Sequence, residues 1–283
     1  MLLLIGAVVV LVSVLGGFMM EKGNVSTLIQ PAEMIIIAGA ALGSLLISSP
    51  RSLLVYVVKS VSGSIKGGKN TGKKEYLGLL VLLYRLFSKI RKDGLVAVES
   101  DIEKPKDSPI FRSHEIADAG VIDFICDNMK VIITTNVPSH ELESLMDLEI
   151  ETRQHEAMAP SKSLARVADA LPGLGIVAAV LGVVLTMGKI DQPPAVLGRC
   201  IGDALTGTFF GILLSYGFVS PLSTNLEHKA KKDEVEFQII KVAIVSFVGG
   251  AAPQIAVEFG RRAVPGEDRP SFNELEKEVR GAR

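Results

Sequence analysis

Four apolar segments divide this chain of 283 residues. They are Met1–Met20, Met34–Ser49, Leu171–Gly188 and Ala204–Ser220, and none of them contains Asp, Glu, Lys, Arg or His. Because an α-helix needs about 20 mainly apolar residues to cross the roughly 30 Å hydrocarbon layer of a bilayer, each segment is interpreted as a membrane-spanning helix. A protein without an ionisable group at membrane depth cannot supply a proton relay alone.

The alternation of apolar and polar sequence predicts an all-α polytopic membrane protein with four regions. Residues 1–50 are expected to form a transmembrane hairpin, residues 51–168 a large helical cytoplasmic domain, residues 169–222 the third and fourth transmembrane helices, and residues 223–283 a cytoplasmic helical tail. The composition agrees with this class, since 48% of the residues are hydrophobic and the mean hydropathy is +0.38, which is high for a soluble domain.

Helical periodicity continues through the polar regions. Apolar residues recur at helical spacing over Glu75–Lys92, and Gly94 follows a basic last turn, as a glycine commonly does at a helix C-terminus. A short second helix is expected to begin at Leu95, and further helices over Ile116–Thr134 and Ser139–Ala157. The large polar region is therefore predicted to be helical throughout.

Two apolar stretches outside the four segments need a separate interpretation. Leu53–Val58 is predicted to continue the second helix into the cytoplasm. Ile239–Val257 is interrupted by Gly249 and Pro253, and a span there would carry the basic tail across the membrane. We predict that it extends the fourth helix in the cytoplasm and packs on the large loop, with a fifth span as the alternative.

Basic residues near the ends of the spans predict the orientation, because cytoplasmic flanks are enriched in Lys and Arg. Eight such residues flank the polar block and the tail, against three on the opposite side. The polar block, the tail and both termini are therefore expected in the cytoplasm. The eight are Arg51, Lys59, Lys66, Lys162, Arg166, Lys229, Lys231 and Lys232, and the three are Lys22, Lys189 and Arg199.

Composition and motifs exclude several classes of function. The 30 basic and 31 acidic residues nearly cancel, so nothing favours binding of nucleic acid. The sequence contains no P-loop, Rossmann glycine motif or Ser/His/Asp set, and its four histidines show no metal-ligand spacing. Cys126 and Cys200 are interpreted as inert packing thiols. We therefore expect neither an enzyme nor a cofactor or metal site.

Small residues recur at spacings of three or four along the apolar segments. In lipid, such ladders allow close approach of helix backbones. They permit packing within the chain alone, or an oligomer whose inner wall is built from the third and fourth helices. The ladders are Gly39 and Gly43 in the second segment, Gly175, Ala179 and Gly182 in the third, and Gly207, Gly211 and Ser215 in the fourth.

The third and fourth segments also carry hydroxyl groups and prolines with two possible roles. The hydroxyls of Thr186, Thr206, Thr208 and Ser215 can coordinate a cation, or can donate to a backbone carbonyl, which is the commoner fate. Pro172 and Pro221 are expected at the ends of the two helices, where they either terminate the helix or act as rigid break points in a conformational step.

Six runs in this sequence resemble, in the same order, the A subunits of flagellar motor stators, the MotA family. The two longest resemble the third and fourth membrane helices of that family, a pattern shared with the TolQ and ExbB energisers. The two N-terminal spans and the tail runs favour MotA. The runs are Glu99–Glu103, Met146–Glu151, Asp169–Val184, Gly207–Leu222, Ala256–Arg261 and Arg269–Phe272.

The resemblance implies a stator subunit, in the inner membrane of a bacterial cell, that converts ion flow into torque. MotA-like subunits form a ring of five around a dimer of MotB, which is anchored to peptidoglycan and supplies the ion-binding Asp. The ring then acts on the rotor protein FliG. The resemblance also assigns residue roles: Arg91 and Glu99 face the rotor, Pro172 and Pro221 couple ion flow to torque, and Thr208 lies near the ion path.

The coupling ion is predicted to be the proton. Sodium-driven relatives carry a further hydroxyl on the third helix, where this chain has Ala179, and Thr186 follows on the same helix as a candidate for the ion path. A sodium ion needs several oxygen ligands, whereas a proton needs only a carboxylate. The alternatives are a proton-driven energiser of the ExbB or TolQ type and a membrane scaffold without ion flow.

Overall fold

The computed structural model describes residues 2–65, 72–112, 119–135 and 137–281, and within these ranges the chain is helical and contains no strand. It divides into two compact units. The first comprises Met1–Gly68 and Ala157–Lys229, and the second comprises Lys69–Glu156 and Ala230–Arg283. The helices α9 and α11 each contribute residues to both units. Lys66 and the first residues of the helix expected from Ile116 lie outside the described residues.

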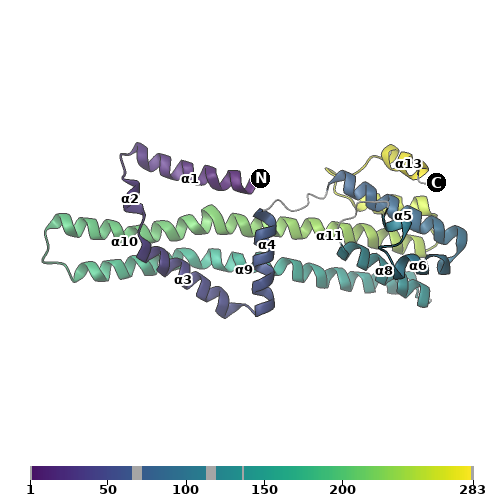
Figure 1. Ribbon diagram of the computed structural model, residues 1–283, viewed down its shortest axis with the longest axis horizontal. Coiled ribbons are helices and arrows are strands. Elements are labelled where there is room, and N and C mark those ends of the chain that lie inside the picture. The colour runs from purple at the N-terminus through teal and green to yellow at the C-terminus, as the bar shows by residue number, and fades with distance from the viewer. Residues whose placement is uncertain (1, 66–71, 113–118, 136, 282–283) are drawn as a thin grey trace. The chain divides into compact units, whose positions relative to one another are not determined.

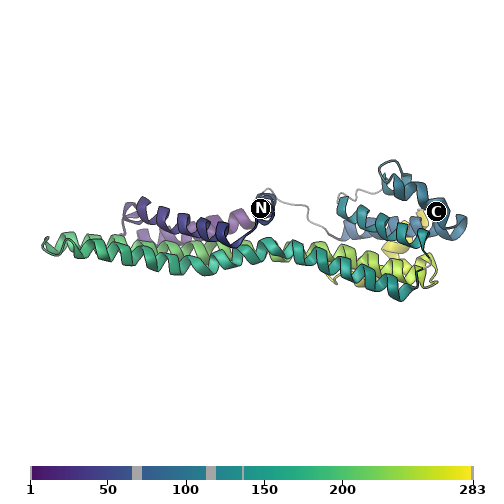
Figure 2. The ribbon, with the colours of Figure 1, turned by 90° about the horizontal axis from the view of Figure 1, so that it is seen from below.

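The first unit contains the apolar segments. Four of its helical stretches are long and apolar enough to cross a membrane: Leu2–Met20, Val25–Ser48, Ser139–Met187 and Pro194–Val248. Figure 2 shows α1 and α3 on one face of the α9–α10 pair. The elements, of which the α-helices are labelled in Figure 1, are α1 (Leu2–Met20), α2 (Val25–Leu28), α3 (Pro31–Ser48), α4 (Arg51–Ile65), α9 (Ser139–Met187), α10 (Pro194–Leu214), the π-helix η2 (Ser215–Val219) and α11 (Ser220–Val248).

Apolar side chains of the first unit point mostly outward. Its buried apolar cluster is small, consisting of Ile37, Ala41, Leu171 and Ala178, and α1 contributes no buried residue. A soluble helix would bury its apolar face, whereas these helices expose theirs, as expected for contact with lipid or with other membrane helices.

The membrane helices are longer than the apolar segments that predicted them. Proline occupies the first position of both α3 and α10, where its missing N–H costs little. Glu33 and Asp203 therefore lie within these helices. The apolar segments themselves hold no ionisable group, but the helices begin before the segments do and therefore include ionisable residues ahead of each segment.

The second helix also ends earlier than predicted. α3 stops at Ser48, and Ser49 adopts an extended conformation with φ −132° and ψ 133°. Pro50 follows and disfavours helical geometry in the residue before it. The apolar stretch after Pro50 belongs to a separate helix, α4, rather than to a continuation of the second span.

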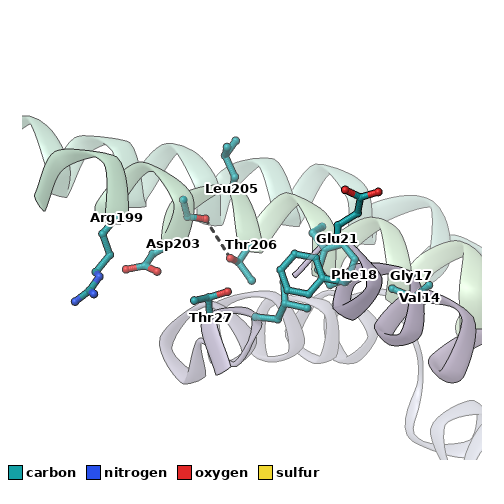
Figure 3. Close-up of a pocket in the computed structure, with 12 residues that line it drawn as sticks. Val14, Gly17, Phe18, Glu21, Thr27, Arg199, Asp203, Leu205 and Thr206 are labelled. Atoms are coloured by element: carbon teal, nitrogen blue, oxygen red, sulfur yellow. Dashed lines mark hydrogen bonds between the residues drawn. The ribbon is translucent and has the colours of Figure 1, made fainter. Parts of the chain in front are cut away.

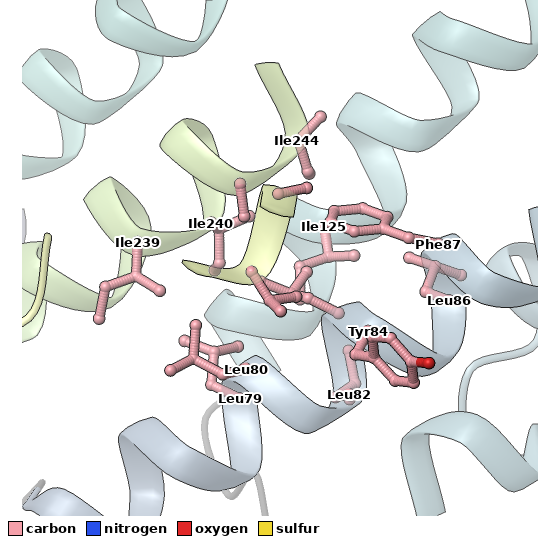
Figure 4. Packing of buried hydrophobic residues seen from close by; sticks show 14 of the residues in the cluster. Leu79, Leu80, Leu82, Tyr84, Leu86, Phe87, Ile125, Ile239, Ile240 and Ile244 are labelled. Carbon is pink, nitrogen blue, oxygen red and sulfur yellow. The ribbon is translucent and has the colours of Figure 1, made fainter. Parts of the chain in front are cut away.

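The second unit has a core of the kind found in soluble proteins. In Figure 4, Leu80 and Phe87 of α5 meet Ile240 and Ile244 of α11, and all four are buried. The ring of Phe87 stacks on that of Phe247 with centroids 4.4 Å apart. The elements are α5 (Lys73–Asp93), the 3₁₀ helix η1 (Leu95–Val98), α6 (Glu99–Glu103), α7 (Pro109–Arg112), α8 (Ala119–Thr134), parts of α9 and α11, α12 (Pro253–Ala263) and α13 (Phe272–Gly281).

This core decides between the two interpretations of the last apolar stretch. Ile239 is fully buried, and Ala256 and Val257 of α12 lie in the same cluster as the apolar face of α5. Gly250 adopts a positive φ of 98° in the turn between α11 and α12. The prediction of an extension of the fourth helix that packs on the large loop is confirmed.

Candidate functional site

The candidate site of the first unit is the seam between α9 and α10. A Cβ placed on Gly211 would lie 2.6 Å from the carbonyl oxygen of Leu171, and one placed on Gly175 would lie 2.8 Å from that of Gly207. These glycines permit backbone contact, so packing of the third and fourth ladders within the chain is confirmed. Gly39 and Gly43 have nothing within 4 Å of such a Cβ, so their ladder packs against no described part of this chain.

Pro172 lies in the interior of α9 instead of ending it. Proline has no N–H, so the carbonyl of Ala168, four residues earlier, has no helical donor. The hydroxyl of Ser215 fills this place, with Oγ donating to the Ala168 oxygen at 2.6 Å. Both residues are buried. The proline on α9 is thus accommodated by a side chain that comes from the end of α10.

Pro221 is accommodated differently. It follows the π-helix η2, in which the N–H of Ser220 donates to the carbonyl of Ser215, five residues earlier. A π-turn inserts one extra residue, a common device at functional sites. The chain continues as α11, so the prediction that Pro172 and Pro221 stand at helix ends, as terminators, is wrong. Their role as break points in a conformational step stays a prediction.

The threonines of the seam differ in how their hydroxyls are used. Thr186 donates to the carbonyl of Gly182 at 2.8 Å, and Thr206 donates to that of Gly202 at 3.2 Å. The backbone role of these two hydroxyls is confirmed. Thr208 is half-buried beside Gly175, and its hydroxyl has no hydrogen-bond partner among the described residues.

A cavity of about 820 Å³ lies between α10 and the α1–α2 corner (Figure 3). Its lining is mainly apolar, including Val14, Phe18 and Phe209, with Arg199 and Asp203 among the charged groups. This volume lies in the range of ligand pockets. No motif in the sequence indicated the cavity, because its walls come from helices that are distant in the chain.

Two polar residues at the start of α3 were missed by the sequence reasoning. Gln30, which precedes α3, donates from Nε2 to Oδ1 of Asp203 at 2.8 Å and so joins α3 to α10. Glu33 is only 8% exposed, and its Oε2 has no hydrogen-bond partner among the described residues. The only signal for Glu33 was a single charge immediately before Met34.

Ala179, predicted to lie at the ion path, is close to this carboxyl group. A Cβ on Gly207 would lie 3.0 Å from Oε2 of Glu33, 3.3 Å from the backbone N of Ala179 and 2.9 Å from Cβ of Ala178. The bare Cα of Gly207 therefore marks the point where α3, α9 and α10 meet.

The candidate site of the second unit is the corner where α5 ends and α6 begins. Gly94 turns the chain with φ 87° and donates to the carbonyl of Ile90. Arg91 and Glu99 are exposed on either side of this turn, and neither forms an ion pair within the part of the chain that the structure describes. The structure thus leaves both predicted rotor-facing charges available to a partner. Their role stays a prediction.

Neighbouring charges at this corner have a structural role. Asp101 is buried and accepts from Nζ of Lys89 at 2.6 Å and from Oγ of Ser108 at 2.7 Å. Charge-assisted hydrogen bonds of this kind are stronger than neutral ones. They fix α6 and α7 against α5, so that Arg91 and Glu99 are presented from a rigid corner.

Reactive side chains give no sign of catalysis among the described residues. No group of three or more His, Cys, Asp or Glu side chains could hold a metal there. Burial raises the pKa of the Cys126 thiol to about 11, so that the thiol is protonated and unreactive at neutral pH.

Two family models match most of the chain. The first, described as "Motility protein A N-terminal", matches residues 4–94. The second, described as "MotA/TolQ/ExbB proton channel family", matches residues 117–239. Only the second pattern is shared with the energisers, so the N-terminal match discriminates between the two groups.

Curated proteins and solved structures resemble the chain over nearly its full length. Motility protein A of Salmonella typhimurium and that of Escherichia coli are each 46% identical over 100% of this chain and 96% of their own. The chemotaxis protein LafT of Vibrio parahaemolyticus is 37% identical over 96% of both. The C. jejuni MotAB structure superposes with a TM-score of 0.79 at 21% identity, covering 95% of this chain and 98% of that one. The Bacillus subtilis MotAB stator complex gives 0.76 at 21%, covering 94% and 96%.

Proposed function

The chain belongs to the motility protein A family, and on this premise we propose that it is a stator subunit of the bacterial flagellar motor. It is a multi-pass protein of the inner membrane that conducts protons with its partner and converts the flow into torque. The observation that carries this proposal is the 46% identity to curated motility proteins over 100% of the chain.

The partner is a MotB-type protein. The similar solved structures are titled as MotAB complexes, and the outer face of α9 fits such an assembly. Ile176, Val180 and Val184 follow one another at four-residue spacing and are 56%, 54% and 61% exposed. We propose that five copies surround a MotB dimer, with lipid covering the remaining apolar surface.

We propose that the second unit and both termini lie in the cytoplasm, as the basic flanks predict. There Arg91 and Glu99 act on the rotor protein FliG. Exposed and unpaired charges of opposite sign steer a complementary surface into register more than they add affinity. The work done is mechanical, so no bond of a substrate is made or broken and no cofactor is required.

The coupling ion is proposed to be the proton. Ala179 supplies no hydroxyl, and Thr186 donates its proton to the Gly182 carbonyl and offers the lone pairs of one oxygen. This arrangement leaves few oxygen ligands on α9 for a sodium ion, which prefers several.

The experiment is deletion of the gene, scored by swimming and by filament staining together. Cells that build filaments but do not rotate them, and that recover when the chain is restored, are the expected result. Normal swimming with sensitivity to detergent would instead indicate an ExbB- or TolQ-type energiser. Normal swimming without any envelope defect would indicate a scaffold without ion flow.

A further inference from the structure

Glu33 stands apart from the other carboxylates of the first unit. It is buried within a membrane helix, and its Oε2 is accessible neither to solvent nor to a hydrogen-bond donor among the described residues. An ionised carboxylate in an apolar environment is costly unless it meets a cation or a donor. Carboxylates retained inside membrane proteins generally mark ion pathways.

The surroundings of Glu33 leave room for its carboxyl group at the helix seam. Gly207 offers no side chain there, and Ala178 offers only a methyl group, so α3 can place Oε2 against the backbones of α9 and α10. A side chain larger than hydrogen at position 207 would contact Oε2 at 3.0 Å. The site is thus formed by α3, α9 and α10. Of these, α9 carries Ala179 and Thr186, the residues predicted to set the ion preference.

Polar residues of α10 near this group line a cavity. Thr206, adjacent to Gly207, lines the cavity beside the α1–α2 corner, and so does Asp203. Gln30 holds Asp203 by a hydrogen bond, which fixes the start of α3 against α10. Polar groups of the cavity therefore come within one residue, along α10, of Gly207, whose Cα faces the Glu33 carboxyl.

We propose that Glu33 is a second ion-binding carboxylate of the stator, supplied by this chain. It binds the coupling proton that enters from the end of the bundle holding α2 and the α9–α10 turn. The neutral acid then releases the proton to the carboxylate of the MotB-type partner and returns to its ionised form. This inference rests on the proposed function, because it requires the partner's ion site.

The test uses the full chain co-expressed with its partner, purified as the complex and reconstituted into vesicles with an imposed proton gradient. Glu33→Gln keeps the shape of the side chain but cannot bind a proton at the same group. We expect proton flux to fall by roughly tenfold or more, within the contribution that positioned proton-transfer groups make. Asp191→Asn removes an exposed carboxylate from the α9–α10 turn and is the matched control, with unchanged flux expected.

The outcomes separate the inference from the proposed function. Wild-type flux in Glu33→Gln, with a conducting wild-type complex, would overturn the role of Glu33 and leave the stator proposal intact. A wild-type complex that conducts no protons would overturn both. If Glu33→Gln fails to assemble, Glu33→Asp decides, because it retains the charge but withdraws the carboxyl by one methylene. The pH dependence of the flux then decides: a shifted midpoint in Glu33→Asp supports the role, and a midpoint identical to that of the wild-type complex overturns it.

Discussion

At the residue scale, the hydrogen bond from Ser215 to Ala168 explains how α9 tolerates Pro172. A buried carbonyl left without a donor costs about 1–3 kcal/mol. We expect Ser215→Ala to destabilise the purified complex by about that amount in thermal unfolding. Ser163→Ala is the matched control, since that buried hydroxyl donates to the Ala159 carbonyl, which retains its own helical N–H donor, and we expect a smaller loss.

A double-mutant cycle tests the cause of this loss. Pro172→Ala returns an N–H to the position that serves the Ala168 carbonyl. In the Pro172→Ala background, Ser215→Ala should therefore lose much of its effect, giving a coupling energy well above the few tenths of a kcal/mol seen for independent sites. Equal losses in both backgrounds would show that Ser215 acts without reference to the proline.

A second residue-scale prediction concerns the charge of Arg91. Because Arg91 is exposed and has no ion-pair partner in the described chain, Arg91→Glu removes no internal contact and should leave the amount of protein in the membrane unchanged. We expect torque on tethered cells to fall, since the rotor surface meets the opposite charge. Loss of the protein from the membrane would indicate a folding role. Lys92→Glu, at the next exposed position, is the control and should have the smaller effect.

At the element scale, α11 changes its environment along its length, with its last turns forming the core of the second unit. Phe87 is fully buried and stacks on Phe247. Truncating such a ring costs about 3–5 kcal/mol, so Phe87→Ala should make the second unit sensitive to limited proteolysis in detergent. Val96→Ala removes an exposed side chain and should leave the digestion pattern unchanged. Resistance in Phe87→Ala would show that the stack contributes little.

The membrane helices were predictable from sequence because lipid demands long uninterrupted apolar runs. The end of α5 at Gly94 and the interruption of the last apolar stretch at Gly249 were predictable from local backbone preferences. The burial of Glu33 and the hydrogen bond of Ser215 were not predictable from the sequence. The Ser215–Ala168 bond joins residues 47 apart in sequence, and the burial of Glu33 depends on the absence of a side chain at Gly207. Both are consequences of helix packing, which periodicity does not specify.

At the scale of the whole molecule, the two cysteines offer a direct test of orientation. The basic flanks put Cys200 on the side of the membrane opposite the second unit, and its sulfur is half-buried near Nζ of Lys189. A membrane-impermeant maleimide added to spheroplasts should therefore label Cys200, and Cys200→Ser should abolish that labelling. Cys126 should stay unlabelled until the protein is unfolded, because its thiol is buried and its pKa of about 11 keeps it protonated at the labelling pH of about 7.

Inside-out vesicles supply the converse measurement. With Cys200→Ser as background, Lys104→Cys places a thiol at an exposed position of the second unit. It should react in inside-out vesicles and not in spheroplasts, because the basic flanks predict that the second unit is cytoplasmic. Labelling of Cys200 only in inside-out vesicles would reverse the orientation and would put Arg91 and Glu99 on the side without a rotor. The same measurement therefore tests the orientation predicted from the basic flanks. It also tests the two proposals that need this orientation, the rotor contact and the proton's point of entry beside Glu33.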